Sequence, residues 1–322
     1  TVFNDFRLEG DLFDFSPLLE NVKSYIEPAD FAFANQESNI GGIEIGLSSY
    51  PNFNSPYEIV RDLVGIGFNM FSRANNHTLD KGENGVILAE SYWQTLNGII
   101  SAGSTDSQEK RDQIPVIEQN GIRLALLAYS YGFNGYRVPE DKPYLANEFS
   151  YEQAEQDIQK AKEVADVIVV SMHWGTEYQD TPNETQLEQA KWLADQGVNV
   201  ILGEHPHVLQ PVDILVGRDG NETLVAYSLG NFISGQTGLA KLVGGILKFD
   251  IIKTTIGDEV KIEISQPQLM PTYNYAENGT VNYQLVPLVE SDQRDYFETV
   301  QALMENYSNV VDVVDYITYD EN

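Results

Sequence analysis

The chain of 322 residues contains no cysteine, which excludes both a disulfide framework and a thiolate metal site. It also has little positive charge: 19 lysines and arginines stand against 49 aspartates and glutamates, and the formal net charge is −30. Nucleic acids and anionic membranes are bound largely through lysine and arginine, so we expect no nucleic-acid partner. No apolar run approaches the roughly 18 residues that a membrane-spanning helix needs.

The chain lacks a starting methionine and a signal sequence, and it begins at Thr1. We therefore expect an export signal or a membrane anchor to precede Thr1 in a longer protein. No repeat, low-complexity tract or long linker divides the sequence, which predicts a single domain over residues 1–322. Its core would span about 14–250, followed by closing strands and a helix over 251–310 and an acidic tail over 311–322.

The apolar pattern of the chain predicts its fold class. Short apolar runs predict buried strands over 30–35, 67–73, 121–131, 166–173, 198–205 and 224–232. Helical patterns cover 84–97, 151–164, 184–196 and 290–307. Strands that alternate with helices predict an α/β fold. After about residue 240, alternating apolar and polar residues predict half-exposed antiparallel strands.

The four histidines of the chain are His77, His173, His205 and His207, and each lies at or just after the carboxyl end of a predicted strand. Open α/β sheets build their sites in the loops at that end. This placement favours a shared site over four unrelated structural histidines.

The segment "GEHPHV" is the sharpest single motif. If it is extended, His205 and His207 point to the same side, and Pro206 stiffens their spacing. Two imidazoles aimed at one point suit a divalent ion such as Zn, Mn or Fe, and His173 offers a third nitrogen. The alternative for "SMHWGTEY" is that Trp174 anchors the core while His173 merely caps a loop.

The stretch "SRANNHTLDKGENG" crowds polar side chains into a few residues. Asn76 offers an amide oxygen as a metal ligand, and His77 can act as a proton donor or electrostatic stabiliser. Asp80 could hold the His77 ring in one tautomer. The alternative is that Asn75, Asn76 or Asp80 caps a helix that starts near Glu83.

Other polar residues complete the candidate site. Glu37 in "NQES" ends the first strand, where a carboxylate could bridge two cations, although a solvated carboxylate or a helix cap is the alternative. Ser228 and Asn231 in "YSLGNFIS" could donate hydrogen bonds to a ligand or belong to an ordinary loop. We expect Asn75 and Glu177 to contact the substrate as well.

Taken in order, "NQES", "ANNHTLDKGENG", "HWGTEY", "GEHPHVLQP" and "YSLGNF" resemble the poly-γ-glutamate capsule synthesis (CapA-type) family over about residues 14–250. That family is similar in fold to the calcineurin-like metallophosphoesterases. The resemblance implies a four-layer α/β/β/α sandwich.

The resemblance also implies a role for each matching residue. It makes Asn76 a metal ligand, His77 the group that protonates or stabilises the leaving group, and Asp80 the acid that orients His77. It makes a bridging carboxylate of Glu37 and places the remaining metal-binding histidines at His173, His205 and His207.

The start of the chain departs from the family pattern. Family members open with a strand ending in Gly-Asp, whereas no apolar strand precedes Gly10 and Asp11 here. We expect that first strand and its aspartate to be missing from the chain, so a complete dinuclear site cannot be assembled from these residues.

The first functional hypothesis is a metal-dependent hydrolase of phosphoester or γ-glutamyl amide bonds, using a metal-bound water together with His77 and Asp80. Its cofactor would be one or two ions of Mn, Zn or Fe. The alternative is a non-catalytic accessory protein for export or anchoring of an anionic surface polymer, and a cytoplasmic phosphatase ranks third. The expected partners are an anionic polymer, or a small phosphorylated or γ-glutamyl substrate, and membrane-bound capsule synthesis proteins. The expected location is the extracellular face of a bacterial cell.

Overall fold

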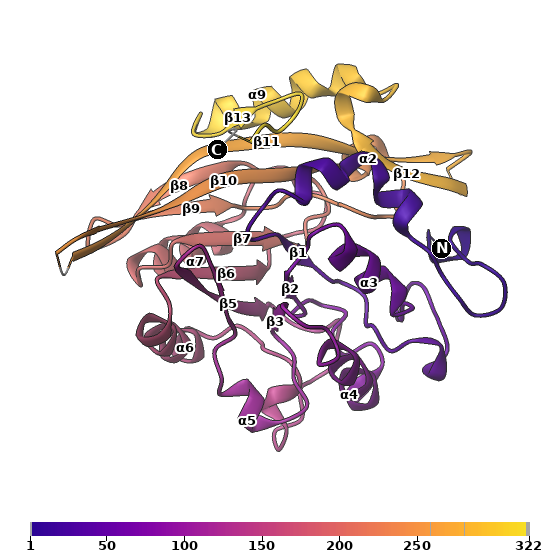
Figure 1. Cartoon of the computed structure of the whole chain (residues 1–322), viewed down its shortest axis with the longest axis horizontal. Coiled ribbons are helices and arrows are strands. Elements are labelled where there is room, and N and C mark those ends of the chain that lie inside the picture. The colour runs from indigo at the N-terminus through magenta and orange to yellow at the C-terminus, as the bar shows by residue number, and fades with distance from the viewer. Residues whose placement is uncertain (1, 258, 280, 320–322) are drawn as a thin grey trace. The chain divides into compact units, whose positions relative to one another are not determined.

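The computed structural model describes residues 2–257, 259–279 and 281–319 (Figure 1). The chain divides into two compact units. The first comprises Thr1–Ala165 and Val170–His173, and the second comprises Asp166–Val169 and Trp174–Asn322. The single-domain assignment made from the sequence stays a prediction.

The first unit combines short parallel strands with surrounding helices. Its helices are α1 (Val2–Asp5), α2 (Ser16–Ile26), α3 (Glu58–Gly65), α4 (Gly82–Trp93), α5 (Gln108–Arg111) and α6 (Tyr151–Val164), with 3₁₀ turns at Ile43–Ile45 and Pro143–Leu145. Its strands are β1 (Phe33–Asn35), β2 (Met70–Ser72), β3 (Ile100–Ala102), β4 (Val116–Gln119), β5 (Ile122–Ser130) and part of β6 (Val167–His173).

The strands of the first unit form two sets. Strands β1, β2 and β3 are parallel, with Ala34 opposite Phe71 and Phe71 opposite Ser101. Strands β4 and β5 form an antiparallel hairpin, and the order there is β4-β5-β6. Residues 124–130 of β5 and all of β6 are buried, which explains why these strands are nearly continuous apolar runs.

The second unit carries the remaining elements. Its helices are α7 (Glu184–Asp195), α8 (Leu239–Leu242) and α9 (Phe297–Tyr307), with 3₁₀ turns at Leu288–Glu290 and Arg294–Tyr296. Its strands are β7 (Val200–Glu204), β8 (Val212–Val216), β9 (Glu222–Ala226), β10 (Val243–Ile256), β11 (Glu259–Glu277), β12 (Val281–Pro287) and β13 (Asp312–Val313).

Two sheet regions organise the second unit. One has the order β6-β7-β9-β8, with β7 and β9 parallel. The other is an antiparallel ribbon, β10-β11-β12, to whose central strand β13 adds in parallel. Helix α9 lies over this ribbon (Figure 1).

The structure confirms the expected α/β sandwich and each strand predicted up to residue 240, as well as the antiparallel strands after it. The helix predicted over 290–307 begins only at Phe297, because 3₁₀ turns precede it. In the described residues before Phe33 the structure forms two helices and no strand, and Gly10 adopts a turn with positive φ. Part of the predicted acidic tail lies outside the described residues.

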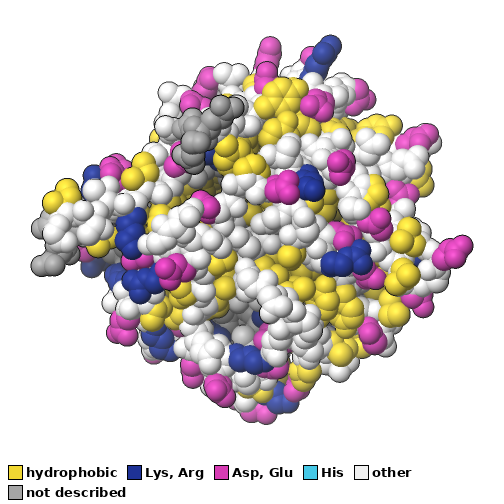
Figure 2. All heavy atoms as spheres, viewed as in Figure 1, with side chains coloured by type: hydrophobic (Ala, Val, Ile, Leu, Met, Phe, Trp, Pro, Cys, Tyr) yellow, Lys and Arg dark blue, Asp and Glu magenta, His cyan; other side chains and the backbone are white. Residues whose placement is uncertain are grey.

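The surface matches the composition. Figure 2 shows aspartate and glutamate side chains spread over the visible face among fewer lysines and arginines. In the part of the chain that the structure describes, no helix has the length and apolar character needed to cross a membrane.

Candidate functional site

The loop after β2 is folded by its own polar side chains. Thr78 Oγ1 donates to the carbonyl of Arg73 (2.7 Å) and accepts from the backbone N–H of Asn75 (2.9 Å). The Asn75 side chain accepts from the backbone N–H of His77 (3.1 Å) and donates to the carbonyl of Gln36 (2.8 Å). Asn75 thus shapes the loop that presents His77, and its contact with substrate stays a prediction.

His77 and Asp80 form a buried pair. His77 Nδ1 lies 2.7 Å from Asp80 Oδ2, and the exposed fractions of the two side chains are 8% and 0%. The backbone N–H of Phe53 donates to the same oxygen (2.7 Å), and the Phe53 ring packs edge-on against the imidazole. Because a carboxylate only accepts, Nδ1 carries the proton and Nε2 is the nitrogen left for chemistry.

The helix-cap alternative for this stretch is wrong. Helix α4 begins at Gly82, its N-cap residue is Lys81, and no side chain caps it. The side chains of Asn75, Asn76 and Asp80 bond elsewhere in the loop and its neighbours. The predicted start near Glu83 is correct to within a residue.

Three potential metal-ligand atoms meet around the His173 ring. Asn76 Oδ1 lies 3.0 Å and Glu37 Oε1 lies 3.8 Å from His173 Nε2. Asn76 Nδ2 donates to Asn134 Oδ1 (3.2 Å), which turns the amide oxygen of Asn76 towards the imidazole. Atoms bound to one ion at about 2.1 Å lie about 3.0–3.4 Å apart at angles of 90–109°. The separation of Asn76 Oδ1 from His173 Nε2 falls in this range, whereas the Glu37 oxygen at 3.8 Å lies outside it. The donor types suit a divalent cation.

A buried ion pair between Arg73 and Glu90 holds the loop after β2 against helix α4. Arg73 Nη2 donates to Glu90 Oε2 on α4 (2.6 Å) and to the carbonyl of Ser104, and both charged side chains are 8% exposed. Among the described residues, Arg73 Nε and Trp93 Nε1 find no hydrogen-bond partner. Arg73 and Trp93 line a cavity of about 20 Å³, which is large enough for one water molecule.

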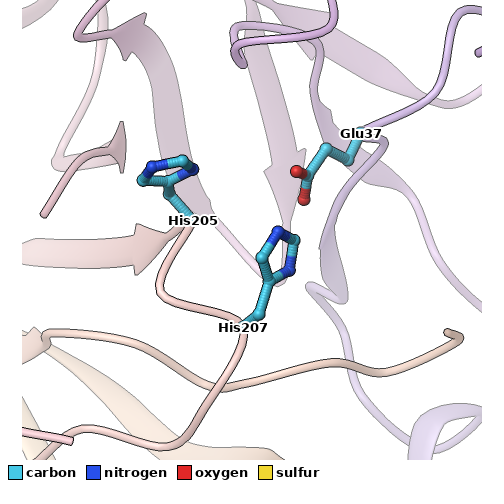
Figure 3. A group of neighbouring side chains, drawn as sticks. All are labelled: Glu37, His205 and His207. Carbon is cyan, nitrogen blue, oxygen red and sulfur yellow. The ribbon is translucent and has the colours of Figure 1, made fainter. Parts of the chain in front are cut away.

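The second unit presents the other two histidines on the loop after β7 (Figure 3). Their ring centroids lie 6.1 Å apart. The sequence prediction of an extended segment is wrong, because φ is +95° at His205 and +59° at His207. The rings come together through a turn, which the backbone N–H of Tyr178 braces by donating to the carbonyl of Pro206 (2.8 Å). Positive φ in non-glycine residues is strained and concentrates at functional sites.

Asn231 fixes the tautomer of His207. Asn231 Nδ2 donates to the carbonyl of Lys241 (2.9 Å) and to Gln236 Oε1 (3.2 Å), so its Oδ1 is the atom that faces His207 Nδ1 at 2.9 Å. An amide oxygen only accepts, so Nδ1 of His207 is protonated and Nε2 is the potential ligand atom. Gly244 makes room for this arrangement, since a Cβ there would lie 2.2 Å from the Asn231 carbonyl oxygen.

The remaining predicted residues of this unit differ in accessibility. Ser228 is buried and donates to the carbonyl of Val208 (2.8 Å), so its hydroxyl supports the loop of His207. Glu177 is exposed. The amide of Asn231 is used within the unit, and the substrate contacts of these three residues stay predictions.

A backbone bond links the residues next to two of the histidines. The N–H of Trp174, the residue after His173, donates to the carbonyl of Glu204, the residue before His205 (3.1 Å). The Trp174 indole is buried and donates to the carbonyl of Tyr227 (3.0 Å). Trp174 therefore anchors the core of the second unit, as the alternative expected.

Sequence reasoning did not find Asn134 or the Tyr178 ring. Asn134 bonds Asn76, and its Nδ2 lies 3.4 Å from His77 Nδ1. The Tyr178 ring stacks on His207 with centroids 6.1 Å apart. Asn134 precedes a glycine and adopts φ of +50°, so its sequence signal is that of an ordinary turn.

The family model described as "Bacterial capsule synthesis protein PGA_cap" matches residues 3–236. The PGA biosynthesis protein CapA of Bacillus subtilis (strain 168) is 32% identical over 255 residues, covering 74% of this chain and 63% of that protein. The capsule biosynthesis protein CapA of Bacillus anthracis is 28% identical over 284 residues, covering 83% and 66%. The chain thus spans just under two thirds of the length of these relatives.

One solved structure with a similar chain is that of a putative 5′-nucleotidase from Staphylococcus aureus. It is 14% identical, covers 91% of this chain and 52% of that one, and has a TM-score of 0.46.

Proposed function

Because the chain belongs to the bacterial capsule synthesis protein family, we propose that it is a metal-dependent hydrolase acting on an anionic capsule polymer or its precursors at the bacterial cell surface. Its substrates would carry a phosphoester or a γ-glutamyl amide bond. The observation that carries the proposal is the buried His77–Asp80 pair, which shares its loop with the Asn76 amide that faces His173.

We assign the metal to Glu37, Asn76 and His173, together with His205 and His207. Imidazole nitrogens with carboxylate and amide oxygens suit Zn, Mn or Fe. Each of Glu37, His205 and His207 offers one ligand atom. At these residues a bound divalent cation would supply positive charge that stabilises a phosphoryl or carbonyl oxygen and lowers the pKa of water.

His77, when protonated at both ring nitrogens, would deliver the Nε2 proton to the leaving group and keep its Nδ1 proton bonded to Asp80. Asp80 holds the opposite ring nitrogen and is fully buried, so its negative charge acts on the imidazolium with little solvent screening. The Phe53 N–H fixes the carboxylate, and the Phe53 ring limits rotation of the imidazole. These contacts fix the orientation of the ring before any substrate binds.

The test measures bound metal and turnover separately. The chain is loaded with Mn or Zn, and hydrolysis of bis-p-nitrophenyl phosphate and γ-glutamyl-p-nitroanilide is followed. We expect stoichiometric metal and turnover of one substrate, with metal lost in His205→Ala. His77→Asn should retain the metal and lower kcat about 10²–10⁴-fold, the usual contribution of a general acid.

Glu37→Gln should weaken metal binding, whereas Glu109→Gln is the matched control, because Glu109 is an exposed carboxylate on α5. If the wild-type chain binds no metal and shows the same turnover as His77→Asn and His205→Ala, the proposed hydrolase activity is wrong. That result would favour an accessory role in polymer export or anchoring.

A further inference from the structure

A lysine and a tyrosine lie beside His207 in the second unit. The Nζ atom of Lys241 lies 4.7 Å from the centre of the Tyr178 ring. That ring stacks on His207 at an interplanar angle of 27°. Tyr178 is 52% exposed, so the stack opens to solvent. An ammonium within about 6 Å of an aromatic face is held by the quadrupole of the ring.

Lys241 differs from Lys191 and Lys253 in its charge environment. Lys191 pairs with Asp195, and Lys253 pairs with Asp166 at 2.9 Å. Within the described residues no carboxylate oxygen lies within 4.0 Å of Lys241 Nζ, and the ammonium lies over the Tyr178 ring instead. In a chain with a net charge of −30, an ammonium without an acidic partner is a local source of positive potential.

Asn231 couples the lysine to the histidine. Its Nδ2 donates to the backbone carbonyl of Lys241 (2.9 Å), while its Oδ1 accepts from His207 Nδ1 (2.9 Å). The backbone position of Lys241 is therefore fixed relative to the His207 ring. The ring of Tyr178 covers one side of the Lys241 ammonium. The N–H donors of the ammonium that point away from the ring remain available to a ligand.

We propose that Lys241, seated on Tyr178 beside His207, is a binding subsite for an anionic group, a phosphate or a carboxylate, of the substrate. The link to a substrate rests on the proposed function, whereas anion binding at Lys241 can be measured without turnover. An acidic chain that handles an anionic substrate needs such a compensating charge, because approach is otherwise opposed by repulsion.

The experiment is titration calorimetry of the metal-loaded chain with two probes, inorganic phosphate and L-glutamate. Lys241→Met should weaken binding about tenfold, the loss expected for a charge-assisted hydrogen bond. Lys241→Arg should stay within about threefold of the wild type, because it keeps the charge. Tyr178→Phe keeps the ring and should bind like the wild type, whereas Tyr178→Leu should weaken binding.

The matched control is Lys162→Met, which removes the same charge from an exposed position on α6. Equal affinities of Lys241→Met and Lys162→Met for both probes would overturn the proposal. A response to phosphate alone identifies a phosphoester source, and a response to glutamate alone identifies a γ-glutamyl source. If the proposed hydrolase activity is wrong, the wild type binds the anions without turnover. This result differs from equal affinities of the two lysine variants, so failure of the hydrolase and failure of the anion subsite are distinguishable.

Discussion

Replacement of Glu90 by glutamine tests how the loop that carries Asn76 and His77 is held in place. Glu90 lies on α4 and receives Arg73 Nη2 at 2.6 Å, with both side chains 8% exposed. Glu90 Oε1 also accepts a hydrogen bond from Gln94 Nε2 (3.0 Å) and lies 3.3 Å from Lys110 Nζ. The two partners of the ion pair therefore have unequal support.

This inequality sets the expected free energies of unfolding. After Glu90→Gln, the buried guanidinium of Arg73 keeps only neutral acceptors such as the Ser104 carbonyl, so we expect a loss of about 3–5 kcal/mol. After Arg73→Met, Glu90 keeps Lys110 and Gln94, so the loss should fall to about 2–3 kcal/mol. The double variant Arg73→Met with Glu90→Leu leaves no buried charge and should cost less than the sum of the single changes.

Urea unfolding, followed by circular dichroism and tryptophan fluorescence, measures these losses. Glu118→Gln is the control, because Glu118 is an exposed carboxylate on β4. The reasoning is refuted if Glu90→Gln lies within about 1 kcal/mol of the wild type, or if the single changes simply add in the double variant.

Two further outcomes follow from half-buried Asp213 and buried Gly244 in the second unit. Burial raises the pKa of Asp213, although its Oδ1 accepts a hydrogen bond from the Ile214 N–H. The folded state therefore holds the proton more tightly than the unfolded state. The free energy of unfolding falls as pH rises through the interval between the unfolded and folded pKa values. Asp213→Asn should therefore raise the melting temperature at pH 7 and lose that advantage below the ordinary aspartate pKa; an advantage independent of pH would contradict this. Gly244→Ala places a Cβ 2.2 Å from the Asn231 carbonyl oxygen and should cost about 1–3 kcal/mol and weaken metal binding through His207. Gly65→Ala meets open space in α3 and serves as control, and equal metal affinity in both alanine variants would count against the role of Asn231.

Much of the fold could be predicted because burial leaves a direct trace in the sequence. Strands β5 and β6 are continuous apolar runs because most of their residues are buried. Helix α2 was missed although Leu18, Leu19, Val22 and Ile26 have helical spacing and Pro17 lies in its first turn. Strand β3 has three residues, like β1 and β2, and only its last residue, Ala102, is buried, so it leaves no apolar run in the sequence.

The candidate site was predictable in its residue types and less so in its geometry. Histidines after strand ends indicated a shared site, and the pairing of His77 with Asp80 follows from their spacing in one loop. The turn at His205 and His207 was not predictable, because bonds from Tyr178 and Asn231, distant in sequence, accompany its positive φ values. Asn134 lacked any signal beyond that of a turn.

The left-handed backbone at His205 and His207 has a consequence for engineering. Glycine adopts such φ values without the penalty that a Cβ brings, whereas a strained non-glycine residue costs on the order of 1–3 kcal/mol. A screen that selects only for thermal tolerance would therefore enrich glycine at these two positions and discard both imidazoles. A mutant library designed to raise the thermal stability of this chain should therefore keep His205 and His207 unchanged.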